Sequence, residues 1–68
     1  MMIHKFKHDF MTCVGVKEKK YPFTTWQPYE IDGDYFIIQK CARGVDITST
    51  MRMPQKEFMK RFDLVMET

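Results

Sequence analysis

Residues 54–66 read PQKEFMKRFDLVM, and the apolar side chains of this segment recur at helical intervals. Phe58, Phe62 and Val65 are separated by four and then three residues, which places them on one face of an α-helix. Pro54 is tolerated in the first turn of a helix, because the N–H that it lacks would have no partner there. The segment therefore predicts one C-terminal amphipathic helix that begins at or next to Pro54.

The chain before this helix has the pattern of β-strands. Residues 45–53 alternate between apolar or small side chains and polar ones, which predicts a strand with one packed face and one solvated face. Residues 10–16 contain Phe, Thr and Val, which favour a strand, and residues 23–26 predict a short strand between Pro22 and Pro28. Residues 41–44, which include Gly44, predict a turn.

The strongest turn signal is Asp32-Gly33, because glycine adopts positive φ without steric cost and aspartate tolerates it. The pair predicts a hairpin between residues 29–31 and 34–36. The second arm continues as Tyr35-Phe36-Ile37-Ile38, which is apolar at consecutive positions. In a strand such a run has apolar side chains on both faces, so both faces are expected to lie out of water.

Together these elements predict an α+β fold. It is a strongly bent antiparallel sheet, or an SH3-like barrel, of about four to five strands with one C-terminal amphipathic helix. Residues 1–68 are expected to form a single compact domain in which residues 1–9 either fray or add an edge strand. With 44% hydrophobic and 15% aromatic residues, the composition is that of a folded protein rather than a disordered one.

The sequence offers little support for catalysis or for a bound metal. His4, His8 and Asp9 have a spacing that a zinc or nickel site could use, but a structural site needs four ligands. Cys13 could act as a nucleophile with a nearby histidine, although a cysteine between Thr and Val is typical of a buried apolar position. Hairpin geometry explains the two aspartates that flank Gly33. We predict no enzymatic activity, no metal, no cofactor and no small-molecule substrate.

Cysteine usage and hydropathy predict a cytoplasmic protein. Cys13 and Cys41 are the two cysteines, they do not form a Cys-x-x-Cys pair, and reduced thiols are expected. No apolar run approaches the ~20 residues needed to cross a bilayer, and the N-terminal segment lacks the apolar core of a signal peptide. Membrane contact is therefore not expected.

Two functions are consistent with these features of the sequence. The leading prediction is a non-enzymatic protein-interaction module that docks an apolar and aromatic surface onto a larger protein or onto a second copy of itself. Its expected anchors are Trp26, Tyr29, Tyr35 and Ile37. The small size and the lack of catalytic motifs suggest a phage or mobile-element accessory protein that inhibits or modulates a host protein in this way.

The alternative function is a small barrel that binds nucleic acid through a lysine-rich and aromatic tip. The net charge is only +2, but residues 1–20 carry five lysines against one aspartate and one glutamate, a net charge of +3. A basic tip beside aromatic rings could hold phosphates and stack on bases. Glu18 interrupts the basic run, and the aromatic rings could equally turn into the core. The residues of this tip are Lys17, Lys19, Lys20, Tyr21 and Trp26.

Overall fold

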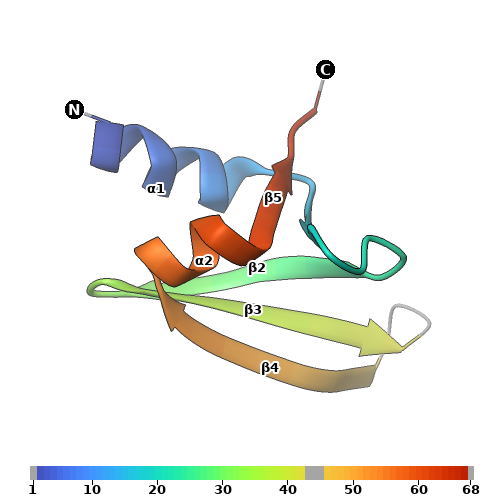
Figure 1. The fold of residues 1–68 in the computed structure, drawn as a ribbon. Coiled ribbons are helices and arrows are strands. Elements are labelled where there is room, and N and C mark those ends of the chain that lie inside the picture. Colours follow the sequence, from blue (N-terminus) through green and yellow to red (C-terminus); the bar gives the residue numbers. More distant parts are fainter. Residues whose placement is uncertain (1, 43–45, 68) are drawn as a thin grey trace.

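The computed structural model describes residues 2–42 and 46–67, with side chains over residues 5–40 and 49–67. Its strands form one antiparallel sheet in the order β4-β3-β2-β1-β5. Both helices lie on the same side of the layer made by β2, β3 and β4 (Figure 1). The elements are α1 (Met2–Thr12), β1 (Gly15–Glu18), β2 (Thr25–Asp32), β3 (Tyr35–Ala42), β4 (Asp46–Pro54), α2 (Gln55–Arg61) and β5 (Phe62–Val65).

The predicted α+β class is confirmed, and the sheet is open. Strands β4 and β5 are its two edges and do not pair with each other. The SH3-like barrel is therefore not confirmed. The described part of the chain also has two helices where one was predicted.

The N-terminal helix α1 corrects the prediction for the start of the chain. Residues 1–9 were expected to fray or to add an edge strand and residues 10–16 to form a strand, but residues 2–12 are helical and β1 begins only at Gly15. Phe6, Phe10 and Cys13 follow one another at helical spacing and pack against the core. This burial of one helical face outweighs the weak strand preference of the local sequence.

The C-terminal helix α2 begins where it was predicted to begin but is shorter. Pro54 is its N-cap, and the helix ends at Arg61 because Phe62 adopts an extended conformation with φ −132° and ψ 153°. Residues 62–65 then form β5, which pairs with all four residues of β1. Phe62 remains buried, so the apolar pattern of the segment serves a helix and a strand in succession.

The predicted β2–β3 hairpin is confirmed, with its loop one residue later than expected. Asp32 and Tyr35 form the closing pair, and Gly33 and Asp34 make the turn. Gly33 has φ +62° at the first loop position, where the favoured hairpin turns need positive φ. The carbonyl oxygen of Asp34 accepts a hydrogen bond of 3.2 Å from the backbone N–H of Gln55, which fixes the turn to the start of α2.

Strand β2 is longer than predicted, because it passes through Pro28. Strand β1 pairs with β2 only through Thr25 and Trp26, so Pro28 lies beyond the end of β1. A bulge follows at Tyr29, between the pairs that Pro28 and Glu30 make with β3. A proline is tolerated in such a place because no ladder hydrogen bond from its nitrogen is needed.

The predicted strand over residues 45–53 corresponds to β4, which runs to Pro54. Met51 and Met53 lie opposite Ile38 and Phe36 of β3 and face the core, as the alternation predicts. The turn expected over residues 41–44 is corrected in part, because Cys41 and Ala42 belong to β3. Residues 43–45 lie outside the described residues.

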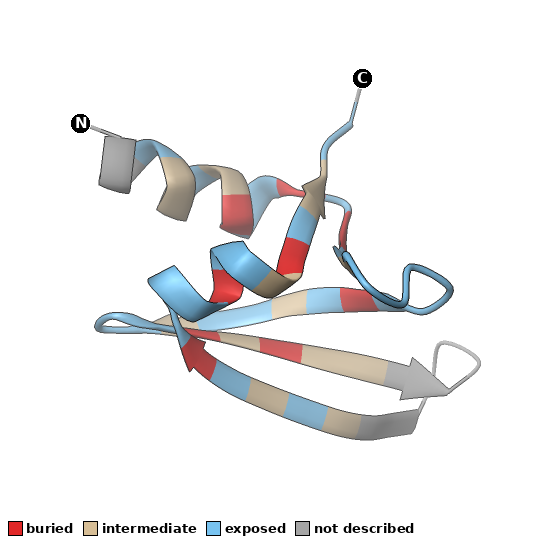
Figure 2. Cartoon of the chain, in the orientation of Figure 1, coloured by how far each residue is buried: buried red, intermediate tan, exposed pale blue. Residues whose placement is uncertain are grey.

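The core is a cluster of aromatic rings between the sheet and the two helices, where the buried residues gather in Figure 2. Phe58 of α2 is at its centre. The Phe58 ring stacks on Phe36 of β3 at a centroid distance of 5.6 Å and on Phe62 of β5 at 5.3 Å. Phe6 and Phe10 of α1 form edge-to-face pairs with it at centroid distances of 6.0 and 5.4 Å. One side chain thus joins both helices to the middle and to one edge of the sheet.

Truncation of this ring is expected to destabilise the whole domain. Phe58→Ala should lower the free energy of unfolding by roughly 3–5 kcal/mol, because it removes a fully buried ring and leaves a cavity. Urea unfolding followed by circular dichroism measures the loss. Met59→Ala, one residue further on the exposed side of α2, is the matched control. It should change the free energy of unfolding by no more than about 0.5 kcal/mol. Similar losses for the two variants would contradict the central role of Phe58.

The turn allows a second stability test that involves the backbone alone. A Cβ at Gly33 would meet no atom within 4 Å, so Gly33→Ala adds strain only through the positive φ. The expected loss is about 1–2 kcal/mol, and Gly33→Asn should lose less because asparagine tolerates this conformation better. Equal stability of Gly33→Ala and the parent protein in thermal unfolding would show that the hairpin does not need the left-handed conformation.

Candidate functional site

The pairing register divides the side chains of β2, β3 and β4 between two faces. Phe36 and Ile38 are fully buried beneath the helices, whereas Tyr35 and Ile37 point to the opposite side. Tyr35 is 41% exposed and Ile37 is half-buried. The apolar run of β3 therefore has one face in the core and one face that neither α1 nor α2 covers. We call the second one the uncovered face, and its other members are Gln27, Tyr29, Glu30, Asp32, Gln39, Thr50, Arg52 and Pro54.

Tyr35 is held in place on the uncovered face by charged neighbours. The guanidinium carbon of Arg52 lies 4.1 Å from the centroid of the Tyr35 ring. The same guanidinium forms an ion pair with Asp32, Nη2 to Oδ2, at 3.2 Å. Asp32 and Tyr35 are the closing pair of the hairpin, so the three side chains form a cross-strand group. At an exposed site the ion pair adds little stability, and its main effect is to orient the ring.

Tyr29 is the extra residue of the bulge in β2. The strand alternates up to Pro28, which lies opposite the buried Ile38, so Tyr29 falls on the uncovered face. The extra residue puts Glu30 on that face as well, opposite Ile37. Tyr29 is 55% exposed. The structure thus places three of the four predicted anchors on the same face of the sheet, namely Tyr29, Tyr35 and Ile37.

Trp26, the fourth predicted anchor, lies elsewhere. It is 5% exposed and belongs to the core, where its ring approaches Phe62 at a centroid distance of 6.1 Å. The Nζ of Lys40 lies 5.3 Å from the Trp26 ring. Trp26 is on the same face of β2 as Pro28, which is the covered face, and its ring is not available to an external partner or to a nucleic-acid base.

The lysines of the predicted basic tip lie around the β1–β2 loop. Lys17 is exposed on β1, opposite Thr25 and Asp63. Lys19 connects the loop to α2: its backbone N–H donates to the carbonyl oxygen of Arg61 at 2.8 Å, and its Nζ donates to that of Met59 at 2.9 Å. Lys20 lies with its Nζ 5.6 Å from the centroid of the Tyr21 ring.

Beside this loop is an open cleft of about 220 Å³ whose lining the sequence did not reveal. Lys19 and Lys20 form one side, and Lys60 and Arg61 at the end of α2 form the other. Glu18 also lines the cleft and lies 3.8 Å from Arg61. Lys60 and Arg61 are adjacent in the sequence, but nothing in the sequence indicated that α2 would end next to the β1–β2 loop.

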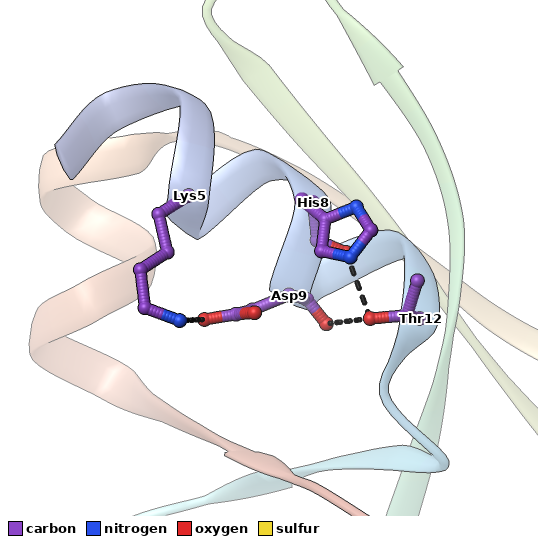
Figure 3. Close-up of polar contacts among 4 residues, drawn as sticks. All are labelled: Lys5, His8, Asp9 and Thr12. Carbon is purple, nitrogen blue, oxygen red and sulfur yellow. Dashed lines mark hydrogen bonds and ion pairs between the residues drawn. The ribbon is translucent and has the colours of Figure 1, made fainter. Parts of the chain in front are cut away.

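Of the candidate metal residues, Asp9 and the backbone of His8 take part in local contacts along α1. Asp9 forms an ion pair with Lys5 at 3.2 Å along α1, and the hydroxyl of Thr12 donates to the carbonyl oxygen of His8 at 2.9 Å (Figure 3). His4 lies where side chains are not described. Among the described residues, no three His, Cys, Asp or Glu side chains come together as metal ligands would.

Comparison with known proteins adds no assignment: the chain matches no family model, and no curated protein or solved structure is significantly similar to it. Neither α1 nor α2, the helices of the described residues, has the length and hydrophobicity of a membrane-spanning segment. The candidate sites therefore depend on geometry alone. They are the uncovered face and the basic cleft.

Cys13 yields a direct test of burial in the core. Its Sγ donates to the carbonyl oxygen of Phe10 at 3.1 Å, and burial raises the pKa of the thiol above its ordinary value. Because the thiolate is the reactive form, Cys13 in a Cys41→Ser background should resist iodoacetamide near neutral pH and react fully in denaturant. Mass spectrometry of both samples measures the labelling. Rapid labelling of the folded protein would contradict this placement.

Proposed function

We propose that this chain is a non-enzymatic protein-interaction module that docks through the uncovered face of β2, β3 and β4. The observation that supports the proposal is the cluster of Tyr29, Tyr35 and Ile37 on the side of the sheet away from both helices. A contiguous apolar and aromatic patch on a small domain is typical of a contact surface. Tyrosine and arginine are also enriched at the energetic centres of such surfaces.

The geometry around Tyr35 lowers the entropy that docking would cost. A tyrosine on a regular strand has few rotamers, and the stacking of Arg52 at 4.1 Å with its ion pair to Asp32 restricts them further. A side chain that is already oriented loses less freedom on binding. The uncovered face is therefore pre-organised for a rigid contact, as a compact inhibitor or accessory protein requires.

The polar side chains of the face define the chemistry of the partner. Gln27, Gln39 and Thr50 supply hydrogen-bonding groups around the apolar centre, and the carboxylate of Glu30 adds a negative charge beside Ile37. A complementary surface has an apolar patch with a polar rim and a cation that faces Glu30. The partner is a larger protein with this surface, or a second copy of the chain in a symmetric dimer.

Removal of the two tyrosines should abolish capture of the partner without unfolding the domain. We expect Tyr29→Ala/Tyr35→Ala to lose at least about 2 kcal/mol of binding free energy, roughly 30-fold in affinity, because exposed aromatic anchors dominate such contacts. Affinity purification from the native cell with quantitative mass spectrometry compares this variant with the parent and with Phe23→Ala. Light scattering of the purified chain detects a second copy.

Phe23→Ala is the matched control because it truncates an exposed ring outside the uncovered face. Proteins kept by the parent and by Phe23→Ala but lost by the tyrosine variant would be the partner. Two results would contradict the proposal if the variant remains folded by circular dichroism. One is a monomeric parent protein that captures no protein selectively. The other is a partner that the parent, the tyrosine variant and Phe23→Ala capture equally well.

A further inference from the structure

The basic cleft lies between two segments that are far apart in the sequence. Lys19 and Lys20 come from the loop after β1, and Lys60 and Arg61 come from the last turn of α2. Lys19 donates one hydrogen bond to α2 from its backbone N–H and another from its Nζ. These two bonds hold the loop and the helix together as the two walls of the cleft. Four cations against the single carboxylate of Glu18 give the lining an excess positive charge. The cleft is accordingly suited to an anion.

The four cations of the cleft differ in whether they already pair with a carboxylate of the protein. Arg61 lies 3.8 Å from Glu18, and Lys19 lies 3.8 Å from Asp63 while it donates to Met59. Lys20 and Lys60, by contrast, have no carboxylate partner among the ion pairs of the described residues. Lys20 and Lys60 are thus the side chains that can neutralise a bound anion without breaking an existing pair.

Two exposed aromatic rings follow the cleft in the same loop. Tyr21 is 56% exposed, and the centroid of its ring lies 5.6 Å from the Nζ of Lys20, which lines the cleft. Phe23 is 91% exposed, the most exposed of the large apolar side chains that the structure describes. Exposed rings in a loop that also carries exposed cations are a combination with which proteins hold single-stranded nucleic acid.

We propose that the basic cleft is a backbone subsite for single-stranded nucleic acid, with Lys20 and Lys60 at two successive phosphates and with Tyr21 and Phe23 as platforms for the adjacent bases. This site is separate from the uncovered face and does not depend on the docking function. A cleft of about 220 Å³ is small for a drug-sized molecule, which needs roughly 300 Å³ or more, and its open shape suits a short stretch of nucleic-acid backbone.

The geometry favours a single strand over other polyanions. Bases in a duplex are already stacked on each other, so Tyr21 and Phe23 could not stack on them without opening the helix. An anionic membrane would meet the loop as a flat surface, and stable membrane attachment generally takes more than one weak signal. The concave arrangement of Lys20 and Lys60 fits a chain of separated phosphates.

The probe for the test is a fluorescein-labelled oligothymidine of about 12 nucleotides, within the site size of small single-strand binders. Its anisotropy is measured against the full chain at several salt concentrations. Two phosphate contacts predict a slope of log affinity against log salt of about −1.4, at ~0.7 for each contact. The same titration is repeated with a duplex of that sequence and with phosphatidylserine vesicles.

Matched variants separate the charge from the rings. Lys60→Ala should weaken binding and reduce the slope by about 0.7, whereas Lys56→Ala, on the same helix but outside the cleft, should leave the slope unchanged. Phe23→Ala should lower affinity at least about fivefold with little change in slope. Tyr29→Ala/Tyr35→Ala should bind the oligonucleotide as the parent does.

Three results would overturn the inference. They are the absence of salt-sensitive binding to the oligothymidine, equal effects of Lys60→Ala and Lys56→Ala, and tighter binding to the duplex or to the vesicles than to the single strand. Circular dichroism of each variant excludes loss of fold as the cause. Failure of this site would leave the tyrosine variant's effect on protein capture untouched, so the two proposals are tested independently.

Discussion

The arrangement of the molecule depends on the contact of Phe58 of α2 with rings from α1 and from two strands. Helix α2 follows β4, one edge of the sheet, and leads into β5, the other edge. The crossing is stabilised because Phe58 stacks on Phe36 and Phe62 while Phe6 and Phe10 close over it. Aromatic pairs of this kind each contribute about 0.5–1.5 kcal/mol beyond the burial of their area. In a chain of 68 residues these contacts are a large part of the net stability.

This packing also determines which surfaces remain exposed. Both helices of the described residues lie on the same side of β2, β3 and β4, so neither of them covers the other side. The apolar pattern of β3 then divides between core and solvent, and Tyr35 and Ile37 remain at the surface. At the far edge, pairing of β5 with β1 brings the end of α2 to the β1–β2 loop, where Lys19 binds its last carbonyls. The uncovered face and the basic cleft are thus two consequences of one chain path.

Local patterns predicted the elements whose contacts are also local. The hairpin at Gly33, the alternation of Met51 and Met53 and the start of α2 at Pro54 follow from backbone preferences and side-chain period, and all are present. The end of α2 was not predictable in this way. The spacing of Phe58 and Phe62 fits a continuing helix. An extended Phe62 becomes more favourable than a helical one because residues 62–65 can then pair with the edge of β1. Likewise, Phe6 and Phe10 needed the rest of the core before a helix at the N-terminus became stable.

The distribution of aromatic residues connects the fold to the candidate sites. Of the six phenylalanines, Phe6, Phe10, Phe36, Phe58 and Phe62 pack in or against the core, together with Trp26. Each of the three tyrosines is at least 41% exposed, and Phe23 is the one phenylalanine that joins them. Burial of a ring of this size would gain about 1.5–3 kcal/mol, so an exposed Phe23 leaves a considerable stabilisation unused in a domain with little to spare. Tyrosine tolerates the surface because its hydroxyl remains hydrated, but phenylalanine has no such group. The exposure of Phe23 in the loop that also carries Lys20 is therefore the surface feature that stability explains least, and it supports the proposal that the β1–β2 loop contacts another molecule.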